Sequence, residues 1–158
     1  MKIILEGCDG TGKTTLAKIL AERYKLDICH LTQRDPTSYY FYAQTARKED
    51  VVWDRHTLGE LIYPEIFDRK QNLSFDQARV IIDRAKSEGV KILILTAEND
   101  VIKQRLLERK SPPEDERIIA NYEKINGGFV FYGDVFGIPV IDTTKVTLKE
   151  IFDMIEKE

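Results

Sequence analysis

The chain has 158 residues, of which 42% are hydrophobic, and this length suits one domain with its own core. Lys and Arg number 24 against 27 Asp and Glu, so the net charge of −3 excludes the broad basic surface of duplex-binding domains and we expect no nucleic-acid partner. Apolar runs such as residues 92–95 are far shorter than the roughly 20 residues that span a bilayer, and we expect a cytoplasmic protein without a membrane partner.

Cysteine and histidine are rare. The chain holds two cysteines, Cys8 and Cys29, and two histidines, His30 and His56. This number and spacing fit neither a disulfide framework nor a zinc site built on cysteine. We therefore expect no structural metal.

Short apolar segments alternate with amphipathic ones along the chain. Residues 2–6 form an apolar run without alternation, which is typical of a buried strand. Residues 13–24 carry Leu16, Ala17 and Leu20 at helical spacing. Further strands are expected at 27–31, 51–53, 90–96 and 138–142, and further helices at 37–47, 56–67, 74–86, 99–110, from 114 onward and from 148 onward.

The ends of several elements have local signals. Ser74 is a candidate N-cap, and Gly89 marks a helix end before the clearest strand of the chain. Residues 111–113, Ser-Pro-Pro, interrupt a helix, and the acidic residues 114–116 suit the first turn of the next one. Residues 127–137 fit either a helix or a loop. The order of elements predicts an α/β fold with a mainly five-stranded parallel sheet covered by helices on both faces.

A phosphate-binding motif lies between the first strand and the first helix. Residues 7–14 read Gly-Cys-Asp-Gly-Thr-Gly-Lys-Thr and fit G-x-x-x-x-G-K-[ST] in the context that this motif requires. Backbone amides at the helix N-terminus would hold the phosphates of ATP, Lys13 adds a charge, and the Thr14 hydroxyl can bind Mg²⁺. The alternative is an ordinary glycine-rich turn with an exposed lysine. The expected ATP-binding residues are Gly7, Gly10, Thr11, Gly12, Lys13, Thr14 and Thr15.

A second polar group, Asp54-Arg55-His56, follows the third predicted strand. The carboxyl ends of parallel strands line the binding crevice of open α/β sheets. Asp54 could hold a Mg²⁺ ligand water there, while Arg55 binds a phosphate. A purely structural Asp–Arg pair is the alternative.

These segments together resemble the thymidylate kinases, which are related to the deoxynucleoside kinases. The family shows EGxDGxGKTT, a TREP-like segment and a DRY or DRH element, and the chain has residues 6–15, 31–36 and 54–56 in that order. The resemblance implies a P-loop NTPase-type three-layer sandwich of residues 1–158 with a small lid at about 109–117. It implies that Asp9 approaches the sugar of the acceptor, and that Arg34 and Arg55 bind the acceptor.

The resemblance also points to a catalytic arginine in the lid. Thr11 stands where some members have a basic residue, and members that lack this residue take the charge that stabilises the transferring group from the lid. The candidates are Arg105, Arg109, Lys110 and Arg117. Arg109 is preferred for catalysis beside Lys13 and Arg55, and Arg105 is assigned to the bound ATP. A basic helix end that complements the macrodipole is the alternative.

The acceptor base is harder to assign. From Gly7 to Asp54 the interval is 54 − 7 = 47 positions, shorter than in ordinary thymidylate kinases, so the base-binding helices must differ. Phe41 could stack on a base, Gln44 could hydrogen-bond its edge, and Tyr63 is a weaker candidate. Core packing is the alternative for the aromatic residues.

The hypothesis is a nucleoside monophosphate kinase that transfers the γ-phosphate of ATP to a deoxynucleoside 5′-monophosphate, with dTMP or a related pyrimidine nucleotide favoured and Mg²⁺ on Thr14 and Asp54. A deoxynucleoside kinase is the first alternative, with Glu6 or Asp35 as its base. A regulatory ATPase and a kinase for a modified nucleotide are the others. The resemblance also suggests a homodimer through the helices after His56.

Overall fold

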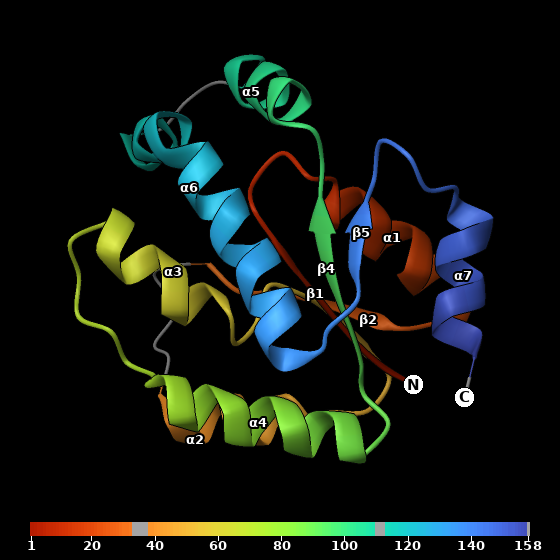
Figure 1. Cartoon of the computed structure of the whole chain (residues 1–158). Coiled ribbons are helices and arrows are strands. Elements are labelled where there is room, and N and C mark those ends of the chain that lie inside the picture. The colour runs from red at the N-terminus through yellow and green to blue at the C-terminus, as the bar shows by residue number, and fades with distance from the viewer. Residues whose placement is uncertain (33–37, 110–112, 158) are drawn as a thin grey trace.

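The computed structural model describes residues 1–32, 38–109 and 113–157, which form a five-stranded parallel sheet between two layers of helices (Figure 1). The strands are β1 (Lys2–Gly7), β2 (Asp27–His30), β3 (Val51–Asp54), β4 (Lys91–Thr96) and β5 (Val140–Asp142), in the order β2-β3-β1-β4-β5. The helices are α1 (Lys13–Tyr24), α2 (Tyr39–Thr45), α3 (Gly59–Ile66), α4 (Phe75–Ser87), α5 (Asn99–Leu107), α6 (Pro113–Phe136) and α7 (Leu148–Glu156). The predicted three-layer fold is confirmed.

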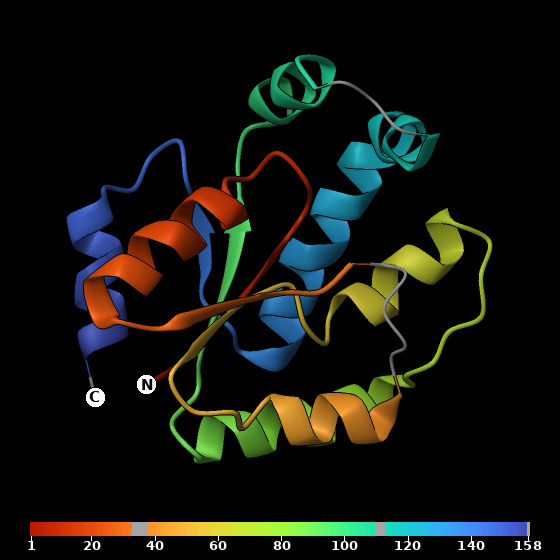
Figure 2. The same cartoon turned by 180° about the vertical axis from the view of Figure 1, so that it is seen from behind.

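Each face of the sheet has its own hydrophobic core. Ile3 and Leu5 of β1 pack with residues of α1 and α7, whereas Ile4 packs with residues of the other helical layer. Seen from behind, α1 and α7 lie together on one side of the sheet and α3, α4 and α6 on the other (Figure 2). This division follows from the period of two in a strand, which sends successive side chains to opposite faces.

Strand register brings the functional segments to one edge of the sheet. β1 is central and pairs in parallel with β3 and β4, so that Leu5 lies beside Asp54 and Gly7 beside Leu95. β2 pairs with β3, and His30 lies beside Asp54. The phosphate loop follows β1, and the residues after β3 and β4 surround it. The edge formed by these strand ends therefore carries the site.

Most element boundaries agree with the sequence predictions, and three helices are shorter than expected. α5 ends at Leu107, before the predicted end at residue 110. α2 begins after Ser38, whose hydroxyl accepts a hydrogen bond from the Phe41 amide at 3.2 Å. α3 begins three residues after His56, because residues 57–58 form the turn that leaves β3. Ser74 caps α4 as predicted, in a capping box with Gln77.

Residues 127–136, which the sequence left open between helix and loop, continue α6 to Phe136. Two adjacent glycines lower the helix propensity there. Tertiary packing outweighs this, because Ile125 and Phe129 on the same helix are completely buried. No helix in the described part of the chain is long and apolar enough to cross a membrane.

Candidate active site

The phosphate loop is a tight turn whose backbone only glycine adopts easily. Gly7 has φ +138°, and a Cβ there would lie 2.3 Å from the carbonyl oxygen of Leu95. Inside the loop, Lys13 Nζ and Thr11 Oγ1 each donate to the Cys8 carbonyl oxygen at 2.7 Å. In the described part of the chain, no side chain caps the N-terminus of α1. Its first amides are thus available to an anion, as the motif predicts.

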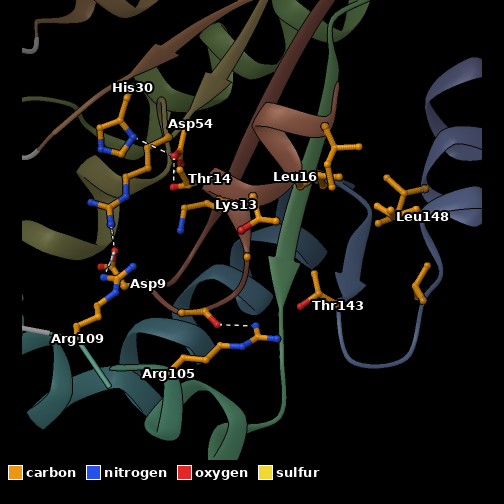
Figure 3. A pocket seen from close by; sticks show the side chains of 17 residues that line it. Asp9, Lys13, Thr14, Leu16, His30, Asp54, Arg105, Arg109, Thr143 and Leu148 are labelled. Atoms are coloured by element: carbon orange, nitrogen blue, oxygen red, sulfur yellow. Dashed lines mark hydrogen bonds and ion pairs between the residues drawn. The ribbon is translucent and has the colours of Figure 1, made fainter. Parts of the chain in front are cut away.

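The loop opens into a cavity of about 820 Å³ (Figure 3). Ten residues predicted from the sequence line it: Asp9, Gly10, Gly12, Lys13, Thr14, Thr15, Asp54, Arg55, Arg105 and Arg109. Burial lowers the pKa of the Lys13 ammonium, and the nearby Arg55 charge lowers it further. An excess of positive charge beside the loop favours the binding of an anion.

Asp54 ends β3 next to the loop and is almost completely buried. Thr14 Oγ1 donates to its Oδ2 at 2.6 Å, and His30 Nδ1 lies 2.9 Å from the same oxygen. The other oxygen, Oδ1, is buried and has no hydrogen-bond partner among the described residues. A hydroxyl and a carboxylate are hard oxygen ligands, which suit Mg²⁺. The pair of Thr14 and Asp54 therefore fits the predicted magnesium site.

Arg55 and Asp9 form a buried ion pair across the loop. Burial alone would raise the pKa of Asp9, but the charges of Arg55 and Lys13 outweigh it and lower the pKa. Arg55 has φ +73°, an uncommon backbone conformation for a residue with a side chain, and its Nε has no hydrogen-bond partner in the described structure. Tyr63 supports the guanidinium, whose carbon lies 5.3 Å from the ring centre. The arginine is thus fixed beside the loop with a free donor.

Two arginines approach the loop from α5 and the segment after it. Arg105 Nη1 donates to the Gly10 carbonyl oxygen at 2.8 Å, and Arg109 Nη1 lies 3.7 Å from Asp9 Oδ1 (Figure 3). The Arg109 side chain is 45% exposed, so it has room to move. Arg117 instead donates to the Phe67 carbonyl oxygen, away from the cavity. Lys110 lies outside the described residues.

The predicted acceptor residues are only partly brought together. Arg34, like Asp35 beside it, lies outside the described residues. Phe41 is half-buried against Trp53, Gln44 is exposed on α2, and Tyr63 is fully buried behind Arg55. None of these last three lines the cavity as the described residues form it.

Several cavity residues were not predicted. His30 ends β2 beside Asp54, and Thr143 follows β5 and donates to the Thr11 carbonyl oxygen at 2.9 Å. The cavity also has an apolar wall. It is formed by Leu16 and Ile19 of α1, by Val146, and by Leu148 and Ile151 of α7. The rule that strand ends line the crevice would have found His30 and Thr143, but only with the strand order known.

Two buried groups support the site from behind. Glu6 Oε1 accepts a hydrogen bond from the Leu58 amide at 2.8 Å, which holds the turn that follows Arg55. Burial raises the pKa of Glu6 to about 7. Burial also lowers the pKa of His56 to about 3, so this imidazole stays neutral at physiological pH. Neither residue lines the cavity formed by the described residues.

Comparison with known proteins adds to this geometry. No family model matches the chain. Cytidylate kinase 2 of Borreliella afzelii is 25% identical over 100% of this chain and 96% of its own length. A probable thymidylate kinase of Methanococcus maripaludis is 24% identical, over 97% of this chain and 92% of its own.

Among solved structures, the YorR protein of Bacillus subtilis, in complex with phosphorylated GDP, has a TM-score of 0.80 and 25% identity over 99% of this chain and 96% of that one. Over nearly its whole length the chain is thus similar to P-loop nucleotide kinases. Thymidylate kinase from Candida albicans has the same fold, with a TM-score of 0.63 and 17% identity over 98% of this chain and 90% of that one. The resemblance to thymidylate kinases, as a shortened relative, is confirmed.

Proposed function

We propose that this kinase transfers the γ-phosphate of ATP to the phosphate of a nucleoside 5′-monophosphate, most favourably a pyrimidine deoxynucleotide such as dTMP. The observation that carries the proposal is Arg55. It is a largely buried side chain, 14% exposed, that lines the phosphate-loop cavity, and its Nε lacks a partner among the described residues. An acceptor that already bears a phosphate needs such a cation, whereas a nucleoside does not.

The donor nucleotide is assigned to the loop and α5. Backbone amides of residues 10–15 and the Lys13 ammonium would bind its phosphates, and Arg105 would contact it from α5. Thr14 and Asp54 would hold Mg²⁺, and the bound ion would neutralise negative charge on the phosphate oxygens. No covalent intermediate is required, because the reaction needs positioning and stabilisation of charge.

The acceptor phosphate is assigned to Arg55, and the acceptor sugar to the side of Asp9. Arg109 is proposed to stabilise the transferring group: its side chain is partly exposed and is already 3.7 Å from Asp9. Residues 110–112 of the predicted lid lie outside the described residues, so lid closure over residues 109–117 stays a prediction. Arg34 is proposed as a second ligand of the acceptor.

The choice of a pyrimidine is supported by the relatives that span the chain, which bear the names cytidylate kinase and probable thymidylate kinase. Phe41, Gln44 and Tyr63 stay predictions as base contacts, because each lies outside the cavity in this conformation. The homodimer also stays a prediction, which sedimentation velocity tests directly.

The test is a panel of acceptors with ATP and Mg²⁺, read as ADP released in a coupled assay. The panel contains dTMP, dCMP, CMP, dGMP and dAMP, and the nucleosides thymidine and deoxycytidine. We expect release to depend on a monophosphate and to be fastest with a pyrimidine. Activity confined to nucleosides would establish a deoxynucleoside kinase instead. ATP hydrolysis indifferent to every acceptor would favour a regulatory ATPase.

The structure gives little support to the deoxynucleoside kinase alternative. Such an enzyme needs a general base within reach of a sugar hydroxyl. Glu6, one of the two candidates, is 1% exposed and turned toward the Leu58 amide. The other candidate, Asp35, lies outside the described residues. The panel above therefore decides the question.

A further inference from the structure

His30 owes its place in the site to strand register. It is the last residue of β2, and β2 pairs with β3 so that His30 lies directly beside Asp54. The side chain is 47% exposed and lines the same cavity as the phosphate loop. An edge-strand residue this exposed contributes little to the core. Its contact with a buried carboxylate therefore calls for a functional reason.

The contact fixes one oxygen of that carboxylate. His30 Nδ1 lies 2.9 Å from Asp54 Oδ2, and Thr14 Oγ1 donates to the same oxygen at 2.6 Å. A carboxylate oxygen accepts, so the imidazole nitrogen is the donor. The terminal torsion of aspartate is otherwise broad, and two donors on Oδ2 restrict it. Figure 3 shows both side chains next to Asp54, with a dashed line from each to its carboxylate.

The restricted carboxylate is the one proposed to hold the metal. With Oδ2 held by two donors, Oδ1 remains buried and without a partner among the described residues. Outer-shell partners that orient a ligand commonly change metal affinity 10- to 100-fold when removed. Thr14 is itself assigned to the metal, so His30 is the one donor of this pair that acts on Asp54 alone.

We infer that His30 is a positioning residue, which orients the Asp54 carboxylate for the divalent cation of the nucleotide complex. The inference rests on the proposed function, because it takes Thr14 and Asp54 as the magnesium site. It goes beyond that function in assigning a role to a residue that acts through Asp54.

The experiment compares three variants on β2 and uses Mn²⁺ as the probe. His30→Ala removes the donor. His30→Asn retains an N–H donor near the position of Nδ1. Ile28→Ala removes another exposed side chain of the same strand and is the matched control, since Ile28 is 45% exposed and does not line the cavity formed by the described residues. Thermal unfolding of each variant verifies the fold.

The first readout is the dissociation constant of Mn²⁺ in the complex of enzyme and ADP, measured by electron paramagnetic resonance. We expect His30→Ala to weaken Mn²⁺ binding by about 10-fold, His30→Asn to restore most of it, and Ile28→Ala to match the wild type. The second readout is steady-state kinetics at fixed pH. In His30→Ala the KM for Mg²⁺ should rise, and kcat should return to the wild-type value at saturating Mg²⁺.

Two results would overturn the inference. One is an unchanged Mn²⁺ affinity in His30→Ala. The other is a loss of kcat that saturating Mg²⁺ does not recover and that His30→Asn shares, because this would place the imidazole in direct contact with substrate. A wild-type protein that binds Mn²⁺ and ADP but transfers phosphate to no monophosphate would instead reject the proposed function.

Discussion

Replacing the buried carboxyl group of Glu6 tests how the site is supported from behind. Burial raises the pKa of Glu6 from 4.5 to about 7 in the folded protein. Between these two values the folded state holds a proton that the unfolded state has lost, so the free energy of unfolding falls as pH rises. The shift in pKa lowers the free energy of unfolding by about 3 kcal/mol in total. This loss is nearly complete at pH 7 and stays constant at higher pH.

Glu6→Gln removes this titration and keeps an oxygen that accepts from the Leu58 amide. The stability of the variant relative to wild type should therefore rise by about 3 kcal/mol between pH 4 and pH 8. His56, whose pKa burial lowers to about 3, makes both proteins less stable as pH falls below its ordinary value of 6.5. That contribution cancels in the comparison.

The assay is urea denaturation of both proteins at a series of pH values, with the free energy of unfolding extrapolated to water. Glu22→Gln is the control, because Glu22 is exposed on α1 and stays in solvent when the chain folds. Its profile should run parallel to that of the wild type. If the free energies of unfolding of Glu6→Gln and wild type change in parallel with pH, Glu6 does not have a raised pKa in the folded protein.

Three further predictions concern the site and the core. Lys13→Ala should lower kcat by at least about 100-fold without loss of fold, and an undiminished rate in the coupled assay would reject the assignment. Arg55→Lys replaces the planar guanidinium, which can donate two parallel hydrogen bonds to a phosphate, with a single ammonium group. It should raise the KM for the monophosphate by roughly 10- to 100-fold. An equal rise in the KM for ATP would contradict it. Gly133→Ala places a Cβ 2.4 Å from Val140 Cγ2 and should destabilise by about 1–3 kcal/mol. Gly127→Ala, on the same helix, places its Cβ in open space and should stabilise by up to about 1 kcal/mol. A Gly133→Ala variant more stable than Gly127→Ala in urea denaturation would contradict the close contact between α6 and β5.

Local patterns predicted much of the fold because each relevant signal is short-range. β1 is a continuous apolar run, which is what a strand covered on both faces requires. The phosphate motif and the Ser74 capping box are each contained within eight residues or fewer. These features depend on neighbours in sequence, so they were accessible without the structure.

Other features depend on tertiary contacts. α6 runs through Gly127 and Gly128 because its flanking residues are buried against the sheet, which propensity does not show. Gln44 was predicted to hydrogen-bond a base edge, yet it lies in solvent on the side of α2 away from Tyr42, which packs against His56. His30 joins the site only because β2 lies beside β3, and strand order is not contained in local periodicity.

Phosphate transfer to a monophosphate is the central claim, and the position of the transferred label tests it most directly. The kinase would be incubated with ATP labelled at the γ-phosphate, Mg²⁺ and dTMP or dCMP, and the products separated by chromatography. We expect label in the β-phosphate of the nucleoside diphosphate, and a loss of that product in Lys13→Ala. Label recovered only as inorganic phosphate, or only in a monophosphate made from added nucleoside, would contradict it.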